Sequence, residues 1–307
     1  AGEGAQTADM QALAKAQQLE KAGAPERAIW SDTGWFRGAD KKWRFEIDDS
    51  LAKFNPSMAD GGLVENAIQN GTPGMNFGPT VGPGMNGNLY HPALFDAYGK
   101  DLPQNTFIGN KNTLFGDGVQ GAFDSATDSI TLNAPVQPRD GRSTLLHELQ
   151  HAVQQREGFA KGGAPSQFTQ LPPDFRLTAQ QLISVDETAK KLGESVDDVA
   201  RLSLEPTLAQ RVNELVKSGQ WDANVNEWRQ NILTPQQQYE RLAGEAEARA
   251  VQSRMDMTPE QRRATFPFDS YDVPRDKLIL RDLLKGPAQS VYHRYTQGGP
   301  DNGAGYM

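Results

Sequence analysis

Two histidines four residues apart, with a glutamate directly after the first, are the residues of this sequence best suited to chemistry. They lie in LLHELQHAVQQ, residues 145–155, where His147, Glu148 and His151 form an H-E-x-x-H motif. In a helix these histidines lie one turn apart on one face, so both imidazoles can bind one metal ion. The neighbouring carboxylate stays free to take a proton from metal-bound water. The pattern therefore predicts a zinc site of the hydrolase type.

A helical projection of residues 143–155 agrees with this interpretation. The histidines fall opposite an apolar face made of Leu145, Leu146, Leu149, Ala152 and Val153. Ser143 or Thr144 is a suitable N-cap, so we expect the helix to begin just before the motif. The alternative is an ordinary surface helix whose solvated face happens to present two histidines.

A zinc hydrolase needs a third protein ligand, and the absence of cysteine restricts it to His, Asp or Glu. No His or Asp follows the motif at the short spacing of the extended HExxHxxGxxH pattern. Candidates are His91, His293 and a glutamate of YERLAGEAEARAVQ, residues 239–252. Glu245 and Glu247 flank the apolar face of that segment about equally, so helical geometry does not choose between them. Either carboxylate could instead be an ordinary solvated charge.

Hydrophobic periodicity predicts a scaffold of mixed helices and strands for these residues. Upstream of the motif we expect a helix over 5–22, an aromatic hairpin around the turn Gly38-Ala39-Asp40, a short helix after His91, and an antiparallel hairpin with its turn near Asp124 to Asp128. In the aromatic hairpin, Trp43, Phe45 and Ile47 alternate with charged residues, which predicts that the aromatic side chains lie in the core.

Downstream of the motif, residues 160–176 are rich in Gly, Pro and Gln and predict a loop. Residues 178–218 have helical periodicity, with Thr178 and Gln181 as a capping box. A further helix is expected over about 235–254. Within this region DETAKKLGESVDDVARLS resembles a helix–turn–helix, but Asp197 and Asp198 would repel phosphates at the start of its second helix. We therefore expect a plain helical insertion.

The composition excludes several classes of protein. A chain without cysteine has no disulfide, thiolate zinc finger or cysteine nucleophile. The net charge of −8 opposes binding to nucleic acid, so we expect no such partner. No apolar run approaches the roughly 20 residues of a membrane helix, and no signal peptide precedes the fold. Since the first residue is Ala1 rather than Met, we expect a processed product or a piece of a longer chain.

Taken in order along the chain, these segments resemble the zincin-type metallopeptidase modules of phage-encoded large polyvalent proteins. HELQHAVQ followed by GEAEAR is the most specific part of the resemblance, which extends from about residue 28 to 280. The other matching stretches are TGWFRGADKKWRFEIDD, LYHPALFDAYG, SITLNAP and YDVPRDKLI.

The resemblance implies a gluzincin-like site in which His147 and His151 bind zinc, Glu148 is the general base and Glu245 is the third ligand. Glu245 is preferred to Glu247 because the first glutamate of an E-x-E-A segment is the ligand in similar helices. Two features depart from the pattern. Glu245 lies 94 positions after His151, and Arg249 stands where many gluzincins have an aspartate that orients a histidine.

The implied fold is α+β and zincin-like, with the motif helix on a small antiparallel or mixed sheet. The expected parts are an N-terminal helix and hairpin region at 1–60, a Gly/Asn/Pro-rich loop at 61–90, a metallopeptidase core at 91–285 with a helical insertion at about 178–230, and a flexible tail at 286–307.

The implied function is hydrolysis of peptide bonds by Glu-assisted attack of zinc-bound water, in a virion protein delivered into a bacterial host. Its partners would be a protein or peptide substrate and other virion proteins. The strand Ser129–Asn133 could pair with an extended substrate. An oxyanion donor is also required, and the candidates are Tyr239, His91, Arg249, His293 and Tyr292. The alternative is a non-catalytic internal virion protein that retains the fold.

Overall fold

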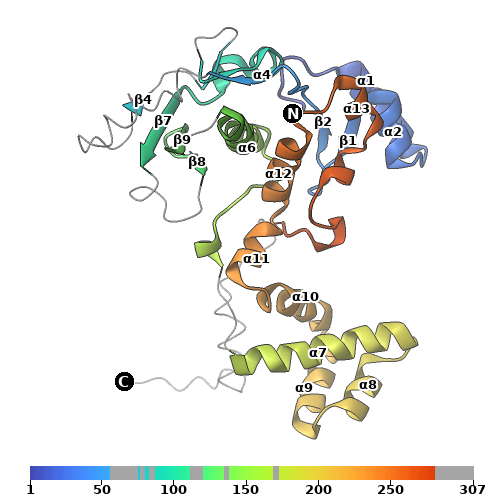
Figure 1. The fold of residues 1–307 in the computed structure, drawn as a ribbon. Helices are drawn as coiled ribbons and strands as arrows, with labels where there is room; N and C mark the ends of the chain where they lie inside the picture. The colour runs from blue at the N-terminus through green and yellow to red at the C-terminus, as the bar shows by residue number, and fades with distance from the viewer. Residues whose placement is uncertain are drawn as a thin grey trace, which may run out of the picture. The chain divides into compact units, whose positions relative to one another are not determined.

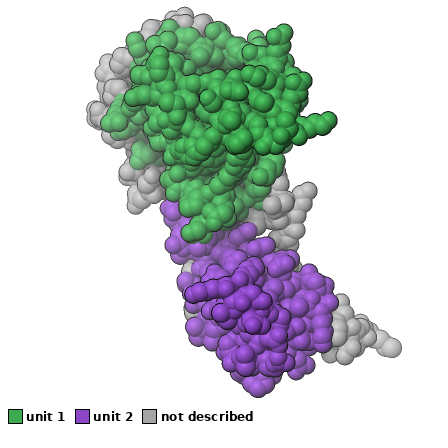
Figure 2. All heavy atoms as spheres, turned by 90° about the vertical axis from the view of Figure 1, so that its right-hand side faces the viewer, with its two compact units in different colours: residues 1–162, 241–284 green, residues 163–240, 285–307 purple. Residues whose placement is uncertain are grey.

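The computed structural model describes residues 1–55, 75–76, 80–82, 87–110, 120–134, 138–168 and 173–280. Contacts divide the chain into two compact units (Figure 2). The first unit joins Ala1–Gly162 to Arg241–Leu284, and the second contains Gly163–Glu240. The first unit therefore holds both the motif and the GEAEAR segment. Most of the expected loop at 61–90 and the expected tail at 286–307 lie outside the described residues.

The N-terminal segment contains two helices and a hairpin. Helix α1, Met10–Lys21, begins after Asp9, whose carboxylate accepts hydrogen bonds from two backbone N–H groups of the first turn. Helix α2, Glu26–Thr33, was not predicted; it ends at Gly34, which has a φ of 77°. Strands β1, Trp35–Arg37, and β2, Trp43–Phe45, form the predicted antiparallel hairpin.

The burial pattern of this hairpin differs from the predicted alternation. Trp35, Phe36 and Trp43 are buried, as expected for core aromatic residues. Arg44 is also buried, with 3% of its surface exposed, although its place in the alternation predicts a solvated side chain. Arg44 can be buried because its guanidinium forms ion pairs with two carboxylates, Asp40 and Glu247. Glu247 comes from a distant part of the chain, so the alternation within the hairpin does not predict this burial.

A four-stranded sheet lies next to the motif helix. Its strands, in spatial order, are β4 (Met75–Asn76), β7 (Asn105–Asn110), β9 (Ser129–Ala134) and β8 (Gly121–Asp124). Strands β7 and β9 are parallel and the other pairs antiparallel, so the sheet is mixed, and the β8–β9 hairpin is the one predicted. Strand β9 is hydrogen-bonded on both sides, so the expectation that it pairs with a substrate is wrong. Among the described strands, β8 is the outer strand on the side of β9, and β4 is the outer strand on the other side.

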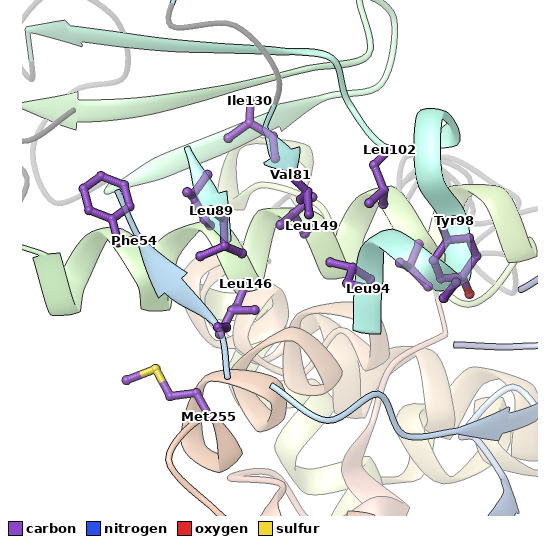
Figure 3. Packing of buried hydrophobic residues seen from close by; sticks show 14 of the residues in the cluster. Phe54, Val81, Leu89, Leu94, Tyr98, Leu102, Ile130, Leu146, Leu149 and Met255 are labelled. Atoms are coloured by element: carbon purple, nitrogen blue, oxygen red, sulfur yellow. The ribbon is translucent and has the colours of Figure 1, made fainter. Parts of the chain in front are cut away.

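The motif lies in α6, Pro138–Glu157, which packs on strands β8 and β9 and against α12, Ala243–Arg254 (Figure 1). The apolar face of α6 is buried as the helical projection predicted, and Figure 3 shows Leu146 and Leu149 among the core side chains. Three short strands complete this core: β3 (Lys53–Phe54), β6 (Leu89–Tyr90) and β5 (Val81–Gly82). The unit is thus a mixed α and β structure, as predicted.

Two predicted helix boundaries are wrong. Ser143 and Thr144 do not cap α6, because that helix begins at Pro138, where the fixed φ of proline suits a first turn. The single helix expected over 235–254 is two helices, α11 (Pro235–Glu240) and α12. The chain is extended at Leu242 because it pairs in parallel with Ile279, a partner far away in the sequence.

Short elements complete the first unit. Helix α4, Pro92–Tyr98, is the one expected after His91, whose ring accepts a hydrogen bond from the Leu94 N–H as its N-cap. The others are η2 (Gly99–Asp101), α13 (Pro259–Ala264), η4 (Pro267–Ser270) and η5 (Arg275–Lys277).

The second unit is helical in its described residues, as expected for the insertion. Its elements are η3 (Pro165–Gln167), α7 (Pro173–Leu192), α8 (Val196–Ser203), α9 (Pro206–Lys217), α10 (Trp221–Asn231) and α11. Helix α7 begins at Pro173, inside the expected loop, so Thr178 lies in the helix and the predicted capping box is wrong. Helix α8 does place Asp197 and Asp198 in its first turn, after the N-cap Ser195.

Candidate metal centre

The fold brings His147, His151 and Glu245 together. The two Nε2 atoms lie 3.2 Å apart, and each lies 3.3 Å from a carboxylate oxygen of Glu245, His147 from Oε2 and His151 from Oε1. These residues form a group whose potential ligand atoms all lie within 4.8 Å of one another. Their side chains are only 12%, 14% and 2% exposed. The site therefore joins two neighbouring helices, α6 and α12.

Hydrogen bonds on the other ring nitrogens fix how the histidines face this point. Gln252 donates through Nε2 to the carbonyl and hydroxyl oxygens of Ser143, so its Oε1 faces Nδ1 of His147 at 3.1 Å. Gln154 donates through Nε2 to the carbonyl of Gly244, so its Oε1 faces Nδ1 of His151 at 2.9 Å. An amide oxygen only accepts, so both Nδ1 atoms are the protonated ones. Both Nε2 atoms therefore face Glu245, and with a metal bound each would offer its lone pair there.

The two Nε2 atoms and the carboxylate of Glu245 lie close together in a buried place, where a positive charge stabilises them. Burial by itself would lower the pKa of His151, but the hydrogen bond and negative charge of Glu245 outweigh it and raise that pKa to about 9. Burial would likewise raise the pKa of Glu245, but the hydrogen bonds from both histidines hold it well below the usual range. Without a metal, a proton on His151 supplies the positive charge.

Glu148 lies beside this group and is itself buried, with 6% of its surface exposed. Burial raises the pKa of its carboxyl, against the opposing charges of His151 and His147, and the backbone N–H of Phe123 in β8 donates a hydrogen bond to it. A carboxylate whose pKa is raised by burial is a stronger base than an exposed one. Strand β8 thus orients the glutamate of the motif.

Two glycines allow the ligands to meet. A Cβ at Gly162 would overlap Oε1 of Glu245 and the ring of His151. A Cβ at Gly244 would overlap the backbone of Lys161 and Gly162. The chain that leaves α6 can therefore cross the first turn of α12 at backbone contact, which brings Glu245 against the histidines.

The structure distinguishes the two glutamates that helical geometry left equal. Glu245 faces the histidines, whereas Glu247 accepts hydrogen bonds from Arg44 at 2.6 Å and from Gln154 at 3.0 Å. The rotation of α12 about its axis, set by its packing on α6, decides between them.

The other candidate residues either have different partners or belong to other parts of the chain. His91 is fully buried and binds Asp49 through Nε2 at 2.8 Å while Nδ1 caps α4, so the structure does not bring it to the histidine pair. Arg249 forms a two-point ion pair with Asp272. Tyr239 lies in α11, in the second unit. His293 and Tyr292 lie outside the described residues.

Sequence reasoning missed the two glutamines that orient the histidines. For each glutamine, the spacing in the sequence places it on the same helix face as a proposed ligand. Gln154 follows His151 by three residues on one helix face, and Gln252 follows Glu245 by seven, which is two turns. Neither spacing distinguishes an orienting amide from a solvated one until the partner helix is placed.

Comparison with known proteins gives one match. Residues 1–55, which span α1, α2, the hairpin and β3, match the family described as Large polyvalent protein associated domain 23. The match supports a polyvalent phage protein context for the chain and does not extend to α6 or α12. No curated protein and no solved structure matches the chain. Among the described helices, none has the length and apolar character needed to cross a membrane.

Proposed function

We propose that the chain is a zinc-dependent metallopeptidase of the gluzincin type, in which His147, His151 and Glu245 hold the metal. The observation that supports this most directly is the convergence of two Nε2 lone pairs and one carboxylate at a single buried point. Bonds of about 2.0–2.1 Å in a tetrahedral site separate ligand atoms by about 3.3 Å. The two Nε2 atoms are 3.2 Å apart, close to this separation, and each lies 3.3 Å from a different oxygen of Glu245, which supports a site of the size that zinc needs.

The number of protein ligands favours catalysis over a purely structural role. Structural zinc sites have four protein ligands, whereas catalytic sites have three and keep one position open. In the described residues the group contains three. A bound zinc ion would supply Lewis-acid activation of water and of a substrate carbonyl.

The residues of the chain would supply the proton transfers. Glu148 would take a proton from the attacking water and deliver it to the leaving amine nitrogen, as its raised pKa suits both steps. Strand β8 is an outer strand of the sheet and already donates to Glu148 through Phe123, so an extended peptide beside β8 would lie close to this base. The polyvalent match at residues 1–55 supports a virion-associated protein that acts in a bacterial host.

The test combines metal analysis with proteolysis of casein. We expect stoichiometric zinc in the purified chain and cleavage that a chelator abolishes. Glu148→Gln should keep the zinc and lower turnover by roughly 10²–10⁴-fold. Glu157→Gln, on the same helix but paired with Tyr98, is the matched control and should cleave normally. A wild-type chain that holds no stoichiometric zinc would overturn the proposal.

A second candidate function is a non-catalytic virion protein in which the metal only fastens the fold. The close burial of the ligands and the backbone contact between Gly162 and Gly244 favour it, because a metal there would join α6 to α12. In that case a chelator lowers the melting temperature, and no peptide bond is cleaved with or without it.

A further inference from the structure

We propose that Arg44, in the N-terminal hairpin, is a positioning residue that fixes which nitrogen of His151 faces the metal, through Glu247 and Gln154. This inference rests on the proposed metal centre, but it concerns residues that the H-E-x-x-H motif does not include. It also assigns a role at that centre to the segment that matches the polyvalent domain.

A continuous chain of hydrogen bonds connects these residues. Arg44 donates through Nε to Oε1 of Glu247 at 2.6 Å. The other oxygen of Glu247 accepts from Nε2 of Gln154 at 3.0 Å, and Oε1 of Gln154 accepts from Nδ1 of His151 at 2.9 Å. The chain thus extends from β2 through α12 to α6, across 203 residues of sequence between its first two members.

The direction of every bond follows from the chemistry of its ends. A guanidinium only donates and a carboxylate only accepts, so the Arg44–Glu247 contact has one orientation. Glu247 and the Gly244 carbonyl both accept from the NH₂ group of Gln154, which turns the amide oxygen toward His151. That oxygen requires a proton on Nδ1 of His151 and leaves Nε2 as the metal-facing lone pair.

Arg44 is itself held rigidly. Asp40 accepts from both of its terminal nitrogens at 2.5 and 2.9 Å, and the ring of Phe159 lies 3.8 Å from the guanidinium carbon. Asp40 also accepts from the backbone N–H of Ala160 at 2.7 Å, which ties the hairpin to the chain just after α6. A Cβ at Gly38 would overlap the guanidinium, so this turn must be glycine.

The two histidines differ in this respect. Gln252, which orients His147, donates to backbone and hydroxyl oxygens of Ser143 and not to a charged group. Of the two orienting amides, Gln154 is the one that contacts an ion pair in the described residues, through Glu247. A change at Glu247 should therefore affect His151 alone.

Glu247→Gln tests the proposal with almost no change in shape. Arg44 cannot accept, so the new amide must direct its oxygen to Arg44 and its NH₂ group to Gln154. Gln154 then faces a second donor. It removes this contact by turning its oxygen toward residue 247 and its own NH₂ group toward His151, with loss of its hydrogen bond to the Gly244 carbonyl. Nδ1 of His151 must accept, so the ring proton moves to Nε2 and blocks metal binding.

The matched control is Glu46→Gln. Glu46 pairs with Arg254, another buried arginine, which lies on α12. In the part of the chain that the structure describes, this pair has no hydrogen bond to either histidine. Each variant removes one carboxylate from a buried ion pair, so a general loss of stability should appear in both.

Zinc affinity, measured in the full chain by competition with a chelator, should fall roughly 10–100-fold in Glu247→Gln and stay near the wild-type value in Glu46→Gln. A second measurement needs no metal. At an alkaline pH beyond which the ring ¹⁵N shifts no longer change, ¹⁵N NMR of the metal-free protein should show Nδ1–H in the wild type and the control, and Nε2–H in Glu247→Gln.

Equal zinc affinities in the two variants, or an unchanged His151 tautomer in Glu247→Gln, would overturn the inference. If the wild type binds no zinc at all, the proposed function fails, and the NMR measurement still decides whether Arg44 and Glu247 set the tautomer.

Discussion

His151 and Glu245 form a pair whose charges make the metal-free site sensitive to pH. The pKa of His151 is raised to about 9 from 6.5, so its interaction with Glu245 stabilises the fold fully below pH 6.5. That stabilisation is lost as the pH rises toward 9, because the imidazolium loses its proton. The lowered pKa of Glu245 belongs to the same interaction, and it means that this stabilisation is also lost as the pH falls below about 4.5.

We therefore predict that the free energy of unfolding of the metal-free protein falls by on the order of 1–3 kcal/mol between about pH 6.5 and 9. Urea denaturation across this range measures it. Glu245→Gln removes the charge that raises the pKa of His151 and should flatten this part of the profile. If the free energy of unfolding of Glu245→Gln still falls over this pH range, another titrating group causes the fall.

At the scale of elements, the junction between α6 and α12 depends on a residue with no side chain. A Cβ at residue 162 would overlap both Glu245 and His151. Gly162→Ala should lower zinc affinity at least about tenfold by displacing these ligands. Its far-UV circular dichroism should match that of the wild type, because the change lies outside any helix or strand. Unchanged zinc affinity would show that Glu245 and His151 accommodate the added methyl group without being displaced.

The helices of the second unit are fastened by a buried carboxylate. Asp186 of α7 has no exposed surface and accepts hydrogen bonds from Trp221, Lys190 and Arg229. Asp186→Ala removes the acceptor that the Trp221 indole and the Arg229 guanidinium share, and should destabilise this unit by about 3 kcal/mol. Denaturation followed by tryptophan fluorescence measures the loss. Glu187→Ala is the control, since its side chain is 66% exposed.

In the whole molecule, the proposed metal ligands, the proposed base and the residues that orient them all belong to the first unit. Gly162 lies at backbone contact with the first turn of α12, and Arg241 is three residues before Gly244. Arg241 is therefore within about 11 Å of Gly244. The two ends of the segment 163–240 are therefore attached to the first unit at points that lie close together.

We predict that replacing residues 163–240 with a flexible linker of about six Gly and Ser residues leaves the metal centre intact. Isothermal titration with zinc should give the affinity of the full chain. A shortened protein that folds but binds zinc much more weakly would mean that the second unit contributes to the site.

Local features of the chain could be predicted from residue types and their spacing alone. The spacing of His147, Glu148 and His151 opposite five apolar residues predicted a helix with one buried face, and the structure has it. The aromatic hairpin and the β8–β9 hairpin were predicted for the same reason, because a period of two residues is visible within a few positions.

Which side chains from distant segments contact each other depends on tertiary packing. Glu245 and Glu247 are equivalent on a helical projection, and the packing of α12 on α6 turned Glu245 to the histidines and Glu247 to Arg44. The helix break at Leu242 depends on Ile279, and the burial of Arg44 depends on a carboxylate 203 residues away. Such interactions leave no trace in local periodicity, because their free energy arises only when the segments are packed together.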